Sequence, residues 1–281
     1  MKKVNLFLSA IIAISFVFTS CEKDESGDPT MNEEMEVSED DALMTDVFDD
    51  AFNDAELAEM ESGLKSAAAI TCREVDKEWS GDTLIITITY NGECEAQIFN
   101  RTRSKSGKII IKRFGGRRYV AGATRIMTFE NYYVNNVHVE GTQTVVSQGL
   151  NQDSTEVMFN IDLVGGKLTF EDGTEVTRDA EKTRLRFFGE SWIDLSDDYW
   201  MIDGKSTGVN YLGNTYTRTL SGLTALYTCR HFVSGIVEIE INDESPIILD
   251  YGEGECDDKA TISKGGASRE ITLKHRKRIR R

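Results

Sequence analysis

The stretch MFNIDLVGGKLTFEDGTEVT, residues 158–177, decides the fold class. From Met158 to Leu163, the residues Phe, Ile and Leu alternate with Met, Asn and Asp. This alternation is the period of a strand with one buried and one solvated face. Gly165–Gly166 and Asp172–Gly173 tolerate the positive φ of tight hairpin turns, and we place a turn at each pair. The stretch therefore predicts antiparallel strands joined by short connections.

The same strand pattern extends from residue 67 to residue 275. Val237, Ile239 and Ile241 alternate with glutamates, and Asn135–Asn136 offers another two-residue turn. The chain has only 2 prolines, so few strands are interrupted. We predict an all-β domain over residues 67–275, an antiparallel meander of about 12–15 strands. A large single sheet, a sandwich and an open barrel all remain compatible with this pattern.

The N-terminus has the features of a lipoprotein signal peptide. Met1-Lys2-Lys3 precedes a largely apolar run from Val4 to Phe18, which is too short for a comfortable transmembrane helix. Small residues followed by Cys21 resemble the lipobox of bacterial lipoproteins. We expect residues 1–20 to be removed and acyl chains on Cys21 to hold the protein on a membrane. An uncleaved N-terminal anchor is the alternative.

Acidic residues are concentrated just after Cys21. Of the 48 acidic residues in the chain, 17 lie between Glu22 and Ser66, and the formal net charge is −16. We predict an acidic disordered tether over residues 21–40, and an amphipathic helix with its linker over residues 41–66. Ser38 and Asp41 form a candidate capping box for this helix. We expect the helix to cover an edge or end of the sheet, and the acidity to belong to the tether rather than to the folded domain.

Four further cysteines follow in a chain that is expected to leave the cytoplasm. An even number favours two disulfides, although three pairings are possible. Thr-Cys-Arg recurs at Cys72 and Cys229, and Gly-Glu-Cys ends at Cys94 and Cys256. This repeat predicts one bridged unit near each end of the domain, with the pairs Cys72–Cys94 and Cys229–Cys256. The spacings do not fit a zinc site, and we expect neither a metal nor another cofactor.

One acidic and aromatic segment, SWIDLSDDYWMID (residues 191–203), is a candidate ligand patch. Aromatic rings beside carboxylates often hold sugar rings or calcium, and a carboxylate pair can hydrolyse a glycosidic bond. The favoured interpretation is an acidic loop whose aromatic residues pack in the core. No Gly-x-Ser-x-Gly elbow is present, and we assign no catalytic residue. The residues of the candidate patch are Asp194, Asp197, Asp198, Trp192, Tyr199 and Trp200.

Two charged segments near the C-terminus have simple interpretations. The acidic turn from Asp250 to Asp258 is a candidate calcium loop, but an exposed turn is favoured. The basic tail, residues 276–281, follows Lys274 and His275 and is interpreted as a solvated end. Contact with envelope phosphates or with the acidic tether is the second choice, and we expect no nucleic-acid partner.

Several segments together resemble a family of uncharacterised Bacteroidetes surface lipoproteins. Glu22-Lys23-Asp24-Glu25, directly after Cys21, also resembles the surface-export signal of such proteins. The resemblance covers nearly the whole chain except its arginine-rich end, and it implies a location and an all-β body but no activity. The segments are FTSC, ALMTDVFDDAFNDAE, NRTRSKSGKIIIKRFGGRR, RIMTFENYYVNNVHVEGTQTV, GKLTFEDGT and ILDYGEGECDDKATI.

These features predict a lipid-anchored outer-membrane protein that is exposed at the cell surface. We expect a non-enzymatic structural or binding module that meets a glycan or an envelope protein. The alternative is a carboxylate-dependent hydrolase that acts on extracellular glycans.

Overall fold

The computed structural model describes residues 29–60, 72–98, 101–190, 196–229, 231–242 and 244–273. These residues form one helix, α1 (Pro29–Met60), and thirteen strands. The strands are β1 (Arg73–Ser80), β2 (Thr83–Ile98), β3 (Arg101–Phe114), β4 (Thr124–Val134), β5 (Val137–Leu150), β6 (Glu156–Thr169), β7 (Glu175–Phe187), β8 (Tyr199–Val209), β9 (Thr215–Leu226), β10 (Ser234–Ile241), β11 (Ile247–Glu253), β12 (Lys259–Lys264) and β13 (Ala267–Thr272).

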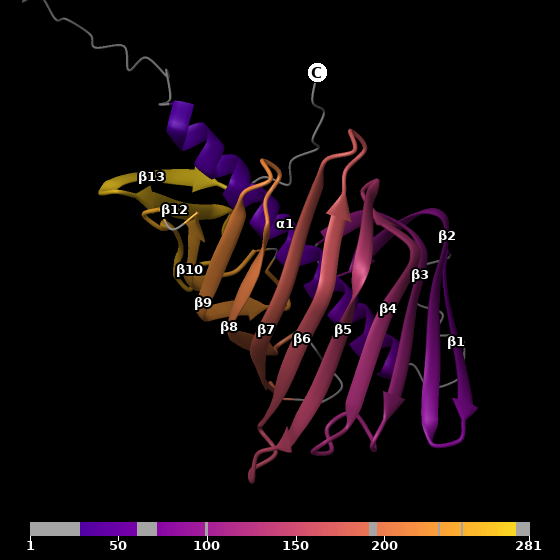
Figure 1. The fold of residues 1–281 in the computed structure, drawn as a ribbon. Helices are drawn as coiled ribbons and strands as arrows, with labels where there is room; N and C mark the ends of the chain where they lie inside the picture. The colour runs from indigo at the N-terminus through magenta and orange to yellow at the C-terminus, as the bar shows by residue number, and fades with distance from the viewer. Residues whose placement is uncertain are drawn as a thin grey trace, which may run out of the picture.

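All thirteen strands belong to one antiparallel sheet in which each strand pairs with its neighbours in the sequence. The predicted all-β meander is confirmed, and the strand number falls within the predicted range. Of the three architectures left open by the sequence, the structure has the single open sheet. Figure 1 shows the sheet curling around α1, which crosses one face obliquely from β12 and β13 toward β3.

The turn predictions are confirmed at two of three places. Asn135 and Asn136 have φ values of 48° and 66° and join β4 to β5, with Val134 paired directly to Val137. Asp172–Gly173 lies in the turn between β6 and β7. The prediction of a turn at Gly165–Gly166 is wrong, because both residues lie inside β6, where the register with β7 shifts. A Cβ on Gly166 would lie 2.7 Å from the carbonyl oxygen of Arg178, so glycine there permits a bulge with close strand contact.

The predicted disulfide pairing is confirmed. Cys72 is bonded to Cys94 and Cys229 to Cys256. The first bridge closes the open end of the β1–β2 pair, and the second closes the open end of the β10–β11 pair. Each repeat unit seen in the sequence is therefore one bridged antiparallel pair, although β12 and β13 follow the second unit.

The helix differs most from its prediction. α1 has 32 residues and begins at Pro29, so residues 29–40 are helical rather than part of a disordered tether. It is about 48 Å long at the usual rise per residue. Ser38 lies inside α1, and the predicted capping box is wrong. Residues 21–28 and 61–66 lie outside the described residues.

α1 lies in the centre of the fold instead of at an edge of the sheet. Phe48, Ala51, Phe52 and Ala55 are at most 1% exposed. The ring of Phe52 contacts the rings of Phe159 and Trp200 edge-on, each at 5.7 Å between centroids. Such burial stabilises each large side chain by roughly 1.5–3 kcal/mol. The helix is therefore part of the hydrophobic core.

Candidate functional site

β7 carries a row of basic side chains on the face that contacts α1. Arg178, Lys182, Arg184 and Arg186 alternate with outward residues, and only Ala180 interrupts the basic row. Successive side chains of a strand point to opposite faces, so these four cations share one face. An isolated buried cation is strongly unfavourable, and each therefore requires a partner. The partners come from the acidic helix.

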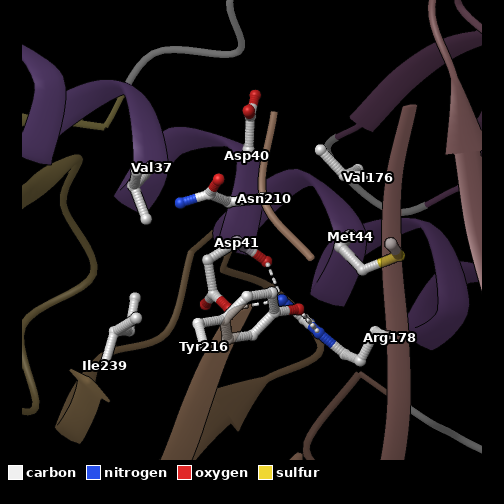
Figure 2. A pocket seen from close by; sticks show the side chains of 9 residues that line it. All are labelled: Val37, Asp40, Asp41, Met44, Val176, Arg178, Asn210, Tyr216 and Ile239. Carbon is white, nitrogen blue, oxygen red and sulfur yellow. Dashed lines mark hydrogen bonds and ion pairs between the residues drawn. The ribbon is translucent and has the colours of Figure 1, made fainter. Parts of the chain in front are cut away.

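The N-terminal half of α1 binds two arginines through Asp41 and Thr45. Figure 2 shows Asp41 facing Arg178, and the two form an ion pair. The other carboxylate oxygen of Asp41 lies 2.8 Å from Nε of Arg218 on β9. Oγ1 of Thr45 accepts hydrogen bonds from Arg178 and Arg218, both at 3.0 Å. Nε of Arg178 also donates to the hydroxyl of Tyr216 at 3.0 Å.

The C-terminal half of α1 binds the middle of the sheet through Glu56. Its Oε1 accepts a hydrogen bond from Arg125 on β4 at 2.7 Å, and its Oε2 accepts one from Arg186 at 3.3 Å. Nε of Arg186 donates to Asp198 at 2.7 Å. The side chains of Glu56, Arg186 and Asp198 are 0% exposed. This chain of charges joins α1, β4, β7 and the residue before β8.

A third contact ties α1 to β2 and β3. Nζ of Lys105 and the hydroxyl of Tyr90 each donate to Oδ2 of Asp54 at 2.6 Å. Between these contacts, Asp49 accepts from Lys182 at 2.9 Å. The acidic residues of α1 are therefore partners of the domain, and the expectation that the acidity belongs to a tether is wrong. The interactions hold the helix in place from Asp41 to Glu56.

Two of these carboxyl groups have pKa values below their ordinary range. Burial alone would raise the pKa of Asp49, but the charges of Lys182 and Arg184 outweigh it. Burial likewise opposes ionisation of Glu56, and its pKa is lowered by Arg125, Arg118 and Arg186. In contrast, burial raises the pKa of Glu59, and the nearby charge of Glu56 adds to this effect.

The protein is expected to lose stability in acid. A carboxyl group with a lowered folded pKa contributes stability above its unfolded pKa, and this contribution disappears as the pH falls through the folded value. The stabilising contributions of Asp49 and Glu56 are therefore lost as the pH falls below about 4. Glu59 offsets part of this loss, because its raised pKa makes protonation favourable in the folded state. Thermal melting between pH 8 and pH 3 measures this effect. A constant melting temperature down to pH 3 contradicts it, and Glu56→Gln should flatten the acid limb.

The sequence-predicted ligand patch is not assembled on one surface. Asp198 and Trp200 are buried, with 2% of each whole residue exposed, whereas Asp197 and Tyr199 are exposed. Trp200 packs under the guanidinium of Arg184, 3.9 Å from its ring centre. Strand alternation at the start of β8 divides these residues between the two faces. Trp192 and Asp194 lie outside the described residues.

The described carboxylates of that patch already accept hydrogen bonds. Asp198 accepts from the backbone N–H of Gly189 at 2.9 Å in addition to Arg186, and Asp197 accepts from the backbone N–H of Glu190 at 2.6 Å. The interpretation as a loop whose aromatics return to the core agrees with Trp200. It does not describe Tyr199, whose ring stacks on Phe187 at 4.3 Å on the face away from α1.

The acidic turn near the C-terminus uses its carboxylates to shape the backbone. Asp250 accepts from the N–H of Gly252 at 2.9 Å, and Asp257 accepts from the N–H of Lys259 at 3.0 Å. Within the described part of the chain, no three His, Cys, Asp or Glu side chains are grouped as metal ligands are. The basic residues from Lys274 onward lie outside the described part.

A small cavity adjoins the Asp41–Arg178 ion pair (Figure 2). Its volume is about 20 Å³, enough for one water molecule. Asn210 lines it and is 4% exposed. The side-chain oxygen of Asn210 accepts from the N–H groups of Leu212 and Asn214, and its amide nitrogen has no hydrogen-bond partner among the described residues. The size and this donor suit an ordered water.

Comparisons with known proteins found no match to a family model, to a curated protein or to a solved structure.

Proposed function

We propose that the protein is an exported cell-envelope lipoprotein that serves as a non-enzymatic binding or structural module. The observation that carries this proposal is the pair of disulfides, Cys72–Cys94 and Cys229–Cys256. Disulfides persist in oxidising compartments and are rare in the cytosol, so they support export. The leader at residues 1–20 and its resemblance to lipoprotein signals support lipidation of Cys21.

The position of α1 defines how such an anchor would hold the domain. Cys21 and Pro29 are 8 positions apart, and an extended chain of this length spans at most about 28 Å. Because α1 is packed into the sheet, a lipid on Cys21 would keep the N-terminal end of α1, and the part of the domain around it, within that distance of the bilayer. Among the described residues, no helix is long and apolar enough to cross a membrane.

The outer membrane, exposure at the cell surface, and a glycan or envelope protein as partner belong to this proposal. They rest on the resemblance to Bacteroidetes surface lipoproteins described above. The alternative of a glycan hydrolase has no specific observation in its favour, because Asp198 is buried in its ion pair with Arg186 and Asp197 holds a backbone turn.

A Cys21→Ala variant tests the anchor. In the native host, the wild-type protein is expected in the membrane fraction and to incorporate radiolabelled palmitate, whereas the variant should lose the label and leave the membrane. Ser20→Ala is the matched control, because alanine keeps a small residue before the cysteine. Retention of Cys21→Ala in salt-washed membranes would refute the lipoprotein proposal.

A further inference from the structure

A second cavity lies beside the N-terminal half of α1, between the helix and the last strands of the sheet. We call it the α1–β13 cavity. Its volume is about 50 Å³, roughly the space of three waters. Glu39, Asp40 and Asp46 of α1 line one side. The remaining wall contains Phe170, Phe232, Leu249, Tyr251, Ile271 and Leu273, with His231 and Thr272 between them.

The charge on this cavity comes from three carboxylates of α1, of which Asp46 is paired with Arg103 of β3. Elsewhere, Asp41, Asp54 and Glu56 face lysine or arginine side chains of the sheet. Around the α1–β13 cavity, no described lining residue is a lysine or an arginine. Figure 2 shows the carboxylate of Asp40 pointing away from Arg178, so Asp41 rather than Asp40 binds that cation.

A buried hydroxyl provides a second, independent observation. Ser38 lines the same cavity and is 2% exposed. Its Oγ has no hydrogen-bond partner within the described part of the chain. A buried hydroxyl without a partner is unfavourable, because the hydrogen bonds that it made to water in the unfolded chain are not replaced. The cavity therefore has a place for a group that donates or accepts a hydrogen bond at Ser38.

The remaining wall is suited to an apolar stem and a cationic head. Phe232 and Tyr251 meet edge-on with their ring centres 5.3 Å apart. Aromatic rings attract cations, and aliphatic stems of lysine and arginine pack on apolar surface. Asp46 is paired with Arg103, and Glu39, Asp40 and His231 also take part in other contacts. A carboxylate has about four acceptor positions, so Glu39, Asp40 and Asp46 can each accept from a further donor.

We propose that the α1–β13 cavity binds one positively charged group on an apolar stem, such as a lysine or arginine side chain. The group donates to Ser38 and to the carboxylates of α1, while its stem lies against Phe232 and Tyr251. Two sources carry this chemistry. One is a separate peptide or amine, and the other is the basic end of this chain, which begins at Lys274 directly after the lining residue Leu273. This inference deepens the proposed binding function. It rests on that proposal only where the cation comes from an outside partner.

Calorimetric titration with n-pentylamine tests the site, with 1-pentanol as the uncharged probe of similar shape. Two proteins are used, the full mature chain and a chain that ends at Leu273. Binding of the amine to the full chain identifies an outside source. Binding only to the shortened chain, with displacement by a peptide of residues 274–281, identifies the chain's own end.

The variant Glu39→Gln/Asp40→Asn should weaken amine binding at least tenfold. Glu238→Gln/Glu240→Gln removes the same charge from β10, where Glu238 and Glu240 alternate with the buried Val237 and Ile239, and should leave binding unchanged. The inference is overturned if neither protein binds the amine, if pentanol binds equally well, or if the α1 variant binds as the wild type does. Because these assays use soluble protein, their failure leaves the membrane result for Cys21 unaffected.

Discussion

A chain that begins at residue 67 is expected not to fold, although the strand pattern alone predicts that residues 67–275 form an independent domain. Without α1, the cations of β3, β4, β7 and β9 lose their buried partners. The uncovered sheet face then leaves clustered cations and large apolar side chains in water, whereas a whole domain is stable by only about 5–15 kcal/mol. Loss of Phe48 and Phe52 also removes the centre of the core.

Circular dichroism and limited proteolysis measure this result, and a chain that begins at residue 29 is the matched control. The control should show a cooperative thermal transition and resist protease, while the shorter chain should show neither. A shorter chain that melts cooperatively at a similar temperature contradicts the central position of α1. Addition of a peptide of residues 29–60 to the shorter chain should restore part of the protection.

Lys105→Met is expected to lower the free energy of unfolding by about 3–5 kcal/mol. Lys105 and Asp54 are 1% and 0% exposed, and the substitution leaves the Asp54 carboxylate buried with only Tyr90 to stabilise it. The double variant Lys105→Met/Asp54→Asn removes both charges and keeps an acceptor for Tyr90. It should be less destabilised than the single variant, because the orphaned charge is gone.

Lys108→Ala on the same strand is the control for the Lys105 prediction. Lys108 pairs with Glu130 at 3.5 Å, but the two side chains are 42% and 52% exposed. Exposed pairs of this kind contribute about 0–1 kcal/mol. Urea unfolding of the three variants and the wild type separates the cases. Equal effects at Lys105 and Lys108 would show that burial does not govern these ion pairs.

The strands and disulfides were predictable because their signals are local. The alternation around Phe159 and the turn at Asn135–Asn136 depend on neighbouring residues, and the repeat of Thr-Cys-Arg and Gly-Glu-Cys indicates which cysteines pair. Gly165–Gly166 was predicted wrongly because glycine pairs serve both turns and bulges. Only the partner strand distinguishes these two uses.

The helix could not be placed from its own sequence. Acids from Glu36 to Asp41 repel one another in an isolated segment, and that composition is typical of disorder. Their partners are remote: Thr45 and Arg218, for example, are 173 positions apart. One signal was present, because β7 repeats basic residues at the period of a strand. Such a buried basic row implies an acidic surface elsewhere in the chain.

The candidate patch around Asp198 failed for a related reason. Adjacent residues on a strand point to opposite sides, so Tyr199 and Trp200 cannot form one binding face. Sequence proximity suggested a cluster, while the backbone geometry separates its members. The α1–β13 cavity had no such signal, because its lining comes from α1, from Phe170 and from residues between His231 and Leu273, which are far apart in the sequence.

The pairing of an early helix with late strands has a consequence for the order of folding. Synthesis presents α1 before any strand, because the helix precedes all thirteen described strands in the chain. The meander can then add one hairpin at a time, since every strand pairs with its sequence neighbour. Local pairing of this kind is fast, but closure onto the first half of α1 must wait for Arg218. The first helix of the chain is therefore expected to be among the last elements to be fully enclosed, because its partner Arg218 lies on β9.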